Sequence, residues 1–124
     1  MRRVVLLWVV AVSAMAPGCA EEEDRVPVQL SWQLADGRDC AEAGIGGVEV
    51  IVTAASAARS TFECSAGLAP NIVDLGAFER GLIEIEVRAL SGSGEPLYEG
   101  TGRSELRGEA SGALIELRFV GADP

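Results

Sequence analysis

The sequence predicts an all-β protein, an antiparallel two-layer β-sandwich of about seven strands of the immunoglobulin-like or prealbumin-like kind. Apolar and polar side chains alternate with a period of two in nearly every segment after residue 25, which is typical of strands with one buried face. Turn-forming residues separate these segments at fairly regular intervals, and no long helical repeat competes with them. A chain of 124 residues is long enough for one such domain.

The alternating runs place the strands in order along the chain. The first run is residues 28–34, and the Asp36–Gly37 pair after it marks a turn. The later runs are 48–53, 62–64, 83–89, 97–102 and 115–119, with a Gly-Ser loop at 91–94. Single helical turns fit only at 40–43 or 54–59. The inward-facing row of the predicted core comprises Trp32, Val50, Phe62, Ile85, Leu117 and Phe119.

Residues 1–18 have the order of a secretory signal peptide of the lipoprotein type. Two arginines precede a continuous apolar run at 4–12, and small residues with Pro17 and Gly18 follow it. The apolar stretch ends near Ala16, which is shorter than the roughly 18–20 residues that span a bilayer. Cleavage and removal are therefore expected rather than a retained transmembrane helix.

Two cleavage routes compete at the end of this segment. Ala14-Met15-Ala16 fits the small-x-small rule of the ordinary signal peptidase, which would give a secreted periplasmic protein without lipid. The small residues followed by Gly18 and Cys19 resemble the lipobox of bacterial lipoproteins, although Met15 and Pro17 are unusual in it. This resemblance implies that the Cys19 thiol accepts a lipid, and it is the route we favour.

The three cysteines fit this interpretation. An odd number in an exported chain leaves one cysteine over. If Cys19 is lipidated, Cys40 and Cys64 remain as a pair, for which an oxidising compartment favours a disulfide. A redox or metal pair is the disfavoured alternative, because the spacing is far from Cys-x-x-Cys and no other soft ligand exists.

Residues 19–25 form an acidic tether, and residues 26–124 form the β-domain. Removal of residues 1–18 leaves 8 arginines against 19 acidic residues, a formal net charge of −11. Such an acidic surface repels nucleic acid phosphates, so no nucleic acid partner is expected. The expected partners are the membrane, through the lipid anchor, and a second envelope protein.

The residues that carry enzyme chemistry are scarce. The chain has no histidine, which removes the commonest general base and zinc nitrogen ligand. Glu84 and Glu86 share a strand face with Arg88, which favours an outward polar row over an acid–base pair. Asp36 and Asp39 lie on either side of Gly37, but their spacing does not match a calcium-binding loop, so a turn is favoured over a calcium site. We therefore expect no catalytic residues, no metal site and no cofactor.

Several motifs mark turns and core positions: Trp32-x-Leu34-x-Asp36-Gly37-x-x-Cys40-Ala41-x-Ala43-Gly44, Val48-x-Val50, Phe62-x-Cys64-x-x-Gly67 and the run from Gly81 to Leu90. These motifs resemble those of small envelope lipoproteins of GC-rich Gram-negative bacteria, whose domain is similar to the carboxypeptidase-regulatory or transthyretin-like β-sandwich. Ile83 stands where that family has a tyrosine. The resemblance covers roughly residues 26–120 and implies a spacer, a surface module or a binding domain, with no catalytic motif.

The expected function is a non-enzymatic interaction or structural module on the cell envelope. Ala20, in place of Asp after Cys19, resembles the pattern that directs release to the outer membrane. The alternative is a module that binds a small ligand or glycan, for which Tyr98 on a late strand near an edge is the candidate aromatic residue; Trp32 is expected in the core.

Overall fold

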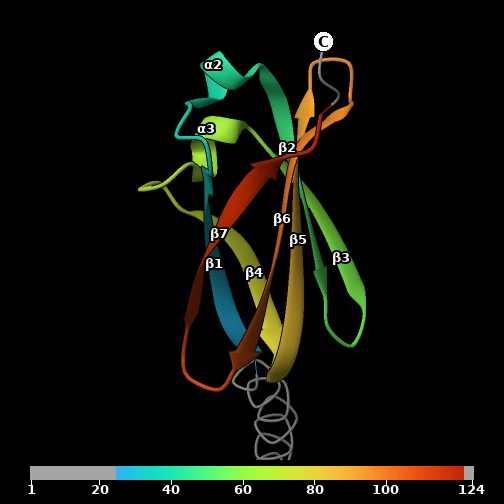
Figure 1. Cartoon of the computed structure of the whole chain (residues 1–124). Helices are drawn as coiled ribbons and strands as arrows, with labels where there is room; N and C mark the ends of the chain where they lie inside the picture. The colour runs from blue at the N-terminus through green and yellow to red at the C-terminus, as the bar shows by residue number, and fades with distance from the viewer. Residues whose placement is uncertain (1–24, 122–124) are drawn as a thin grey trace, which may run out of the picture.

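The computed structural model describes residues 25–121, which form an all-β domain (Figure 1). The strands are β1 (Arg25–Leu34), β2 (Ile45–Thr53), β3 (Ala57–Phe62), β4 (Val73–Glu79), β5 (Gly81–Ser91), β6 (Pro96–Leu106) and β7 (Ser111–Phe119). Two short helices, α2 (Cys40–Ala43) and α3 (Cys64–Gly67), lie in the connections. The all-β prediction with about seven strands is confirmed, as is the single helical turn predicted at 40–43.

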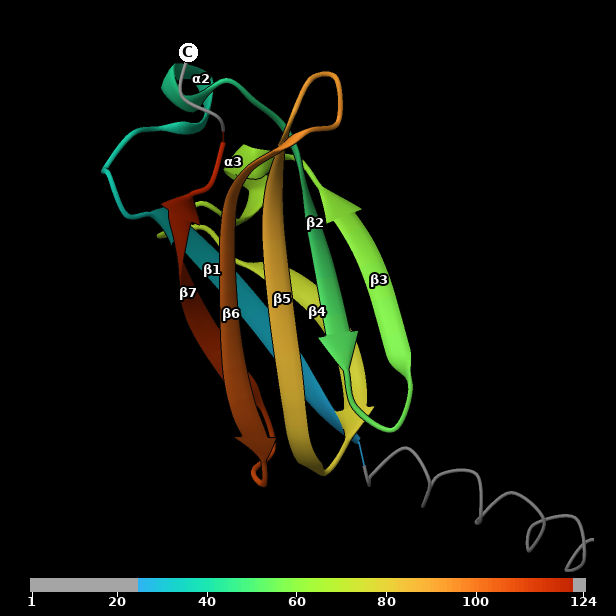
Figure 2. The same ribbon diagram turned by 45° about the vertical axis from the view of Figure 1, so that its right-hand side comes forward.

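The seven strands form one mixed sheet in the order β3-β2-β5-β6-β7-β1-β4. Five of the neighbouring pairs are antiparallel, whereas β1 and β7 are parallel. This pair departs from the antiparallel prediction for a topological reason. Strand direction alternates along the chain, so the first and the seventh strands run the same way when curling of the sheet brings them together (Figure 2).

The curled sheet is joined on one side and open on the other. Residues 111–117 of β7 pair with β1, and the last two residues, Arg118 and Phe119, pair with Glu99 and Tyr98 of β6. We call this β6–β7 junction the linked side. Within residues 25–121, β3 and β4 each have a strand neighbour on one edge only, and we call the side between them the open side. The sheet is therefore nearly barrel-like without being closed.

The core follows the predicted alternation along most strands. Trp32, Val50, Ile85 and Leu117 are buried, as predicted, and Phe62 is half-buried against the core. Phe119 was predicted in the same row but is 48% exposed. At this position β7 has left β1, whose pairing with β7 ends at Leu117, and the Phe119 ring packs on one side only, against Tyr98 of β6.

Two of the strands differ from the sequence-based prediction. Residues 54–59 were expected as a helical turn but form the β2–β3 turn and the start of β3. The strand predicted at 62–64 ends at Phe62, and Cys64 is the first residue of α3. No strand was predicted at β4, where Leu75 has no partner in β1: Val28 pairs with Gly76 and Gln29 with Asp74. Such an irregularity breaks the period of two on which the prediction depends.

The domain has two distinct ends (Figure 1). Arg25, the first described residue, starts β1 at one end, together with the β2–β3, β4–β5 and β6–β7 turns; we call it the entry end. Helices α2 and α3 and the β5–β6 turn lie at the opposite end, which we call the helix end.

Candidate functional site

A disulfide bond between Cys40 and Cys64 crosslinks the helix end. Cys40 is the first residue of α2, which follows β1, and Cys64 is the first residue of α3, which follows β3. Their Cα atoms are 5.9 Å apart. The predicted pairing of these two cysteines is confirmed, and the bond connects the segments that leave β1 and β3.

Trp32 of β1 supports the disulfide from inside the core. Its ring is fully buried, as predicted, and its Nε1–H donates a hydrogen bond of 3.0 Å to the carbonyl oxygen of Cys64. A Cβ atom on Gly67 would lie 2.5–2.8 Å from three carbons of the ring, so only glycine fits there. The backbone N–H of Ala69 donates to the Trp32 carbonyl at 2.8 Å. These contacts fix α3 on β1.

Tyr98 lies on a late strand, β6, as expected, but β6 is flanked by β5 and β7 and is not at an edge. Its side chain is 1% exposed, and its hydroxyl donates a hydrogen bond of 2.6 Å to Oδ2 of Asp36. The ring of Phe119 packs edge-on against it, with centroids 5.4 Å apart. Tyr98 therefore ties β6 to the turn after β1 and offers no aromatic face to a sugar.

In this hydrogen-bonded pair, the pKa of both Asp36 and Tyr98 is shifted. The Tyr98 hydroxyl, followed by the backbone N–H of Arg38, lowers the pKa of Asp36 below its usual value of 3.8. Burial, followed by the hydrogen bond to Asp36, raises the pKa of Tyr98 above its usual value of 10.0. The pair thus favours an ionised carboxylate and a neutral phenol.

The acidic residues near the first turn stabilise local structure. Asp36 Oδ1 accepts a hydrogen bond of 3.1 Å from the backbone N–H of Arg38, which closes the turn. Asp39 caps α2: its side chain accepts from the Glu42 N–H at 2.8 Å, and the Glu42 side chain accepts from the Asp39 N–H at 3.1 Å. Across residues 25–121, no group of three or more acidic or cysteine side chains is arranged to hold a metal ion.

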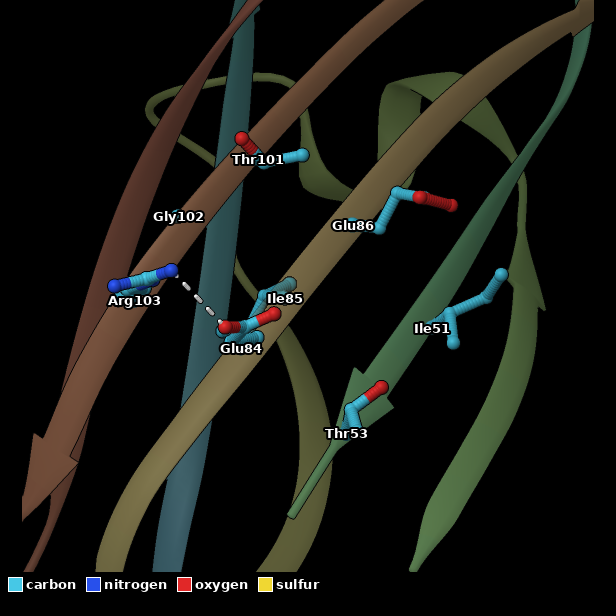
Figure 3. A pocket seen from close by; sticks show the side chains of 8 residues that line it. All are labelled: Ile51, Thr53, Glu84, Ile85, Glu86, Thr101, Gly102 and Arg103. Atoms are coloured by element: carbon cyan, nitrogen blue, oxygen red, sulfur yellow. Dashed lines mark ion pairs between the residues drawn. The ribbon is translucent and has the colours of Figure 1, made fainter.

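The Glu84 and Glu86 row lies on the outer face of β5, beside a groove of about 450 Å³ that β2, β5 and β6 line (Figure 3). Glu84 pairs with Arg103 at 3.3 Å, and Glu86 pairs with Arg88 at 3.0 Å. Each carboxylate therefore lies beside an arginine, although Arg88 also pairs with Glu99 at 3.6 Å. The residues that line the groove include no aromatic side chain. The arrangement resembles a charge-compensated sheet surface rather than an acid–base pair.

Cys19, the predicted signal peptide at 1–18 and residues 19–24 of the predicted tether lie outside the described residues. Among residues 25–121, no helix is both long enough and apolar enough to cross a membrane.

Sequence reasoning missed the Asp36–Tyr98 hydrogen bond. The two residues are 62 positions apart, and the sequence around neither of them indicates a hydrogen-bond partner. The sequence gives one indirect signal: Tyr98 lies in a predicted strand, next to Leu97. If such a tyrosine is buried, its hydroxyl needs a hydrogen-bond partner.

No protein family, curated protein or solved structure matches the chain.

Proposed function

We propose that this chain is a lipoprotein of the bacterial cell envelope, acylated at Cys19 and anchored in the outer membrane of a Gram-negative cell. Its β-domain acts as a non-enzymatic protein-interaction or structural module. The observation that carries the proposal is the Cys40–Cys64 disulfide, because it uses two of the three cysteines and leaves Cys19, at the end of the signal-like segment, for the lipid. A disulfide also fits an exported protein.

The geometry of the domain supports the same function. The described chain begins at Arg25 on the entry end, a few residues after Cys19, so an anchored domain would present its helix end away from the membrane. The carboxylates of the outer groove are paired with arginines, and Trp32 and Tyr98 are buried, which favours a module without catalysis or sugar stacking.

We also infer that the curled sheet works as a two-layer sandwich. Strands β4, β1 and β7 would form one layer and β3, β2, β5 and β6 the other. The support for this division is that β7 contacts β6 through only its last two residues in the strand ladder.

Metabolic labelling with an alkyne-bearing fatty acid tests the anchor. We expect the wild-type chain and the Cys40→Ser/Cys64→Ser double variant to incorporate the label and to enter the detergent phase of a Triton X-114 separation. The Cys19→Ser variant should do neither. Intact mass measurement should show a diacylglyceryl cysteine at the N-terminus, whereas a mature chain that begins at Pro17 without lipid would establish the secreted alternative.

A further inference from the structure

A shallow hollow of about 580 Å³ lies at the helix end, between α2 and α3. Its apolar lining comes from Ile45, Leu68 and the Cys40–Cys64 disulfide, of which Ile45 and Leu68 are half-buried. The disulfide and the Trp32 contacts described above hold both of its walls in place. A rigid apolar hollow of this kind binds with little loss of conformational entropy.

The hollow also borders an unpaired stretch of strand. Strand β2 pairs with β5 from Ile45 onward, but it pairs with β3 only from Val48 onward, because β3 ends at Phe62. In the described chain, Ile45 and Gly47 therefore pair with β5 alone, and Gly46 between them lies at a register shift and has no partner in either strand. An extended segment can add to such an edge by main-chain hydrogen bonds.

Two carboxylates, those of Asp39 and Glu63, stand on the rim of the hollow. Within residues 25–121, neither forms an ion pair, and the nearby Arg38 is paired with Asp36 at 3.7 Å. Both rim residues are exposed. A cationic side chain is therefore the complement of this rim.

We propose that this hollow binds an extended peptide segment of a protein partner, with aliphatic side chains on its floor and a lysine or arginine beside Asp39 and Glu63. The inference deepens the proposed function, on which it rests, by naming the chemistry of the partner. The main chain would supply affinity along residues 45–47, and the charge would supply specificity.

Nuclear magnetic resonance titration of the ¹⁵N-labelled full chain, purified in detergent, tests this site. The probe is a capped pentapeptide of alternating valine and lysine, and the matched probe has glutamate in place of lysine. We expect the lysine peptide to shift the amide signals of Ile45 and Glu63, and the glutamate peptide to shift neither. Glu63→Gln should weaken binding about threefold, and Asp39→Asn/Glu63→Gln about tenfold. Asparagine keeps the helix cap in the double variant.

The control is Glu109→Gln, which removes the same charge from an exposed residue in the β6–β7 turn at the entry end and should leave binding unchanged. Equal binding of both peptides, shifts confined to other surfaces, or no shift at millimolar peptide would overturn the proposal. The same titration with the full-length Cys19→Ser chain does not depend on the lipid. A missing peptide site and a missing anchor therefore give separate results.

Discussion

The two sides of the curled sheet hold the domain together by different means. On the linked side, backbone pairing between β6 and β7 continues the sheet. On the open side, β3 and β4 do not pair. The chain passes from β3 to β4 through α3, and the Cys40–Cys64 bond crosslinks α3 to the segment that follows β1. A crosslink at the helix end can therefore restrain a side of the sheet on which no strand ladder closes.

Removal of the disulfide should have the largest effect, because it removes the crosslink that holds the β3–β4 connection against the segment after β1. For a closed loop with a sequence separation of 24, the chain-entropy relation gives about 3.5 kcal/mol. We expect Cys40→Ala/Cys64→Ala to lower the free energy of unfolding by about 2–4 kcal/mol in urea denaturation. Reductant should lower the stability of the wild type by a similar amount, and a loss below about 1 kcal/mol would mean that the open side is held mainly by packing.

Gly100→Ala probes the linked side. A Cβ atom at this position would lie 2.8 Å from Cγ2 of Ile115 and 2.9 Å from Cδ2 of Leu117, and would also meet the Glu116 carbonyl oxygen. Overpacking of this kind costs about 1–3 kcal/mol, and we expect a loss of stability in the upper part of that range.

Gly112→Ala is the matched control for that change, because a Cβ there meets nothing within 4 Å. Its stability should stay within about 0.5 kcal/mol of the wild type. Equal urea midpoints for the two variants would show that the close approach of β6 and β7 does not hold the linked side.

Tyr98→Phe should cause a smaller loss, because it removes one hydrogen bond and keeps the ring against Phe119. The pKa of Asp36 is lowered in the folded state, so the stabilisation linked to it is fully present above pH 3.8 and is lost as the pH falls through the lowered value. We therefore expect the difference between wild type and variant to shrink below about pH 4 in denaturation series. A difference that stays constant down to pH 2 would show that the hydrogen bond does not depend on the carboxylate charge.

Arg59→Ala should have the smallest effect. Its ion pair with Glu49 across β3 and β2 measures 3.2 Å, but 67% of the Arg59 side chain is exposed. Exposed pairs contribute little, so thermal unfolding should reveal a change within about 0.5 kcal/mol. A loss above about 1 kcal/mol would mean that this edge of the open side is better fixed than its exposure suggests.

The sequence was informative where local pattern decides structure. The alternation in residues 83–89 predicted the buried row of β5, whose members Ile83, Ile85, Val87 and Ala89 are all at most 1% exposed. The cysteine count predicted the disulfide. Turn chemistry at Asp36–Gly37 also predicted a real turn, in which Asp36 accepts from the Arg38 N–H.

Features that depend on the curl of the sheet were not predictable in this way. The parallel pairing of β1 with β7 joins segments at opposite ends of the domain sequence, and no local pattern encodes it. The exposure of Phe119 and the burial of Tyr98 follow from where β7 leaves β1 and meets β6. The hollow at the helix end likewise depends on the end of β3 at Phe62, opposite Val48, which leaves the first three residues of β2 without a partner in β3.

The placement of the first strand has a mechanical consequence. Strand β1 runs from the entry end to the helix end over ten residues, which at about 3.3 Å per residue spans about 33 Å. If the chain is anchored at Cys19, this strand sets the distance between the entry end and the helix end of the domain. A partner that docks at the helix end would then lie about 33 Å beyond the point where the tether joins the domain.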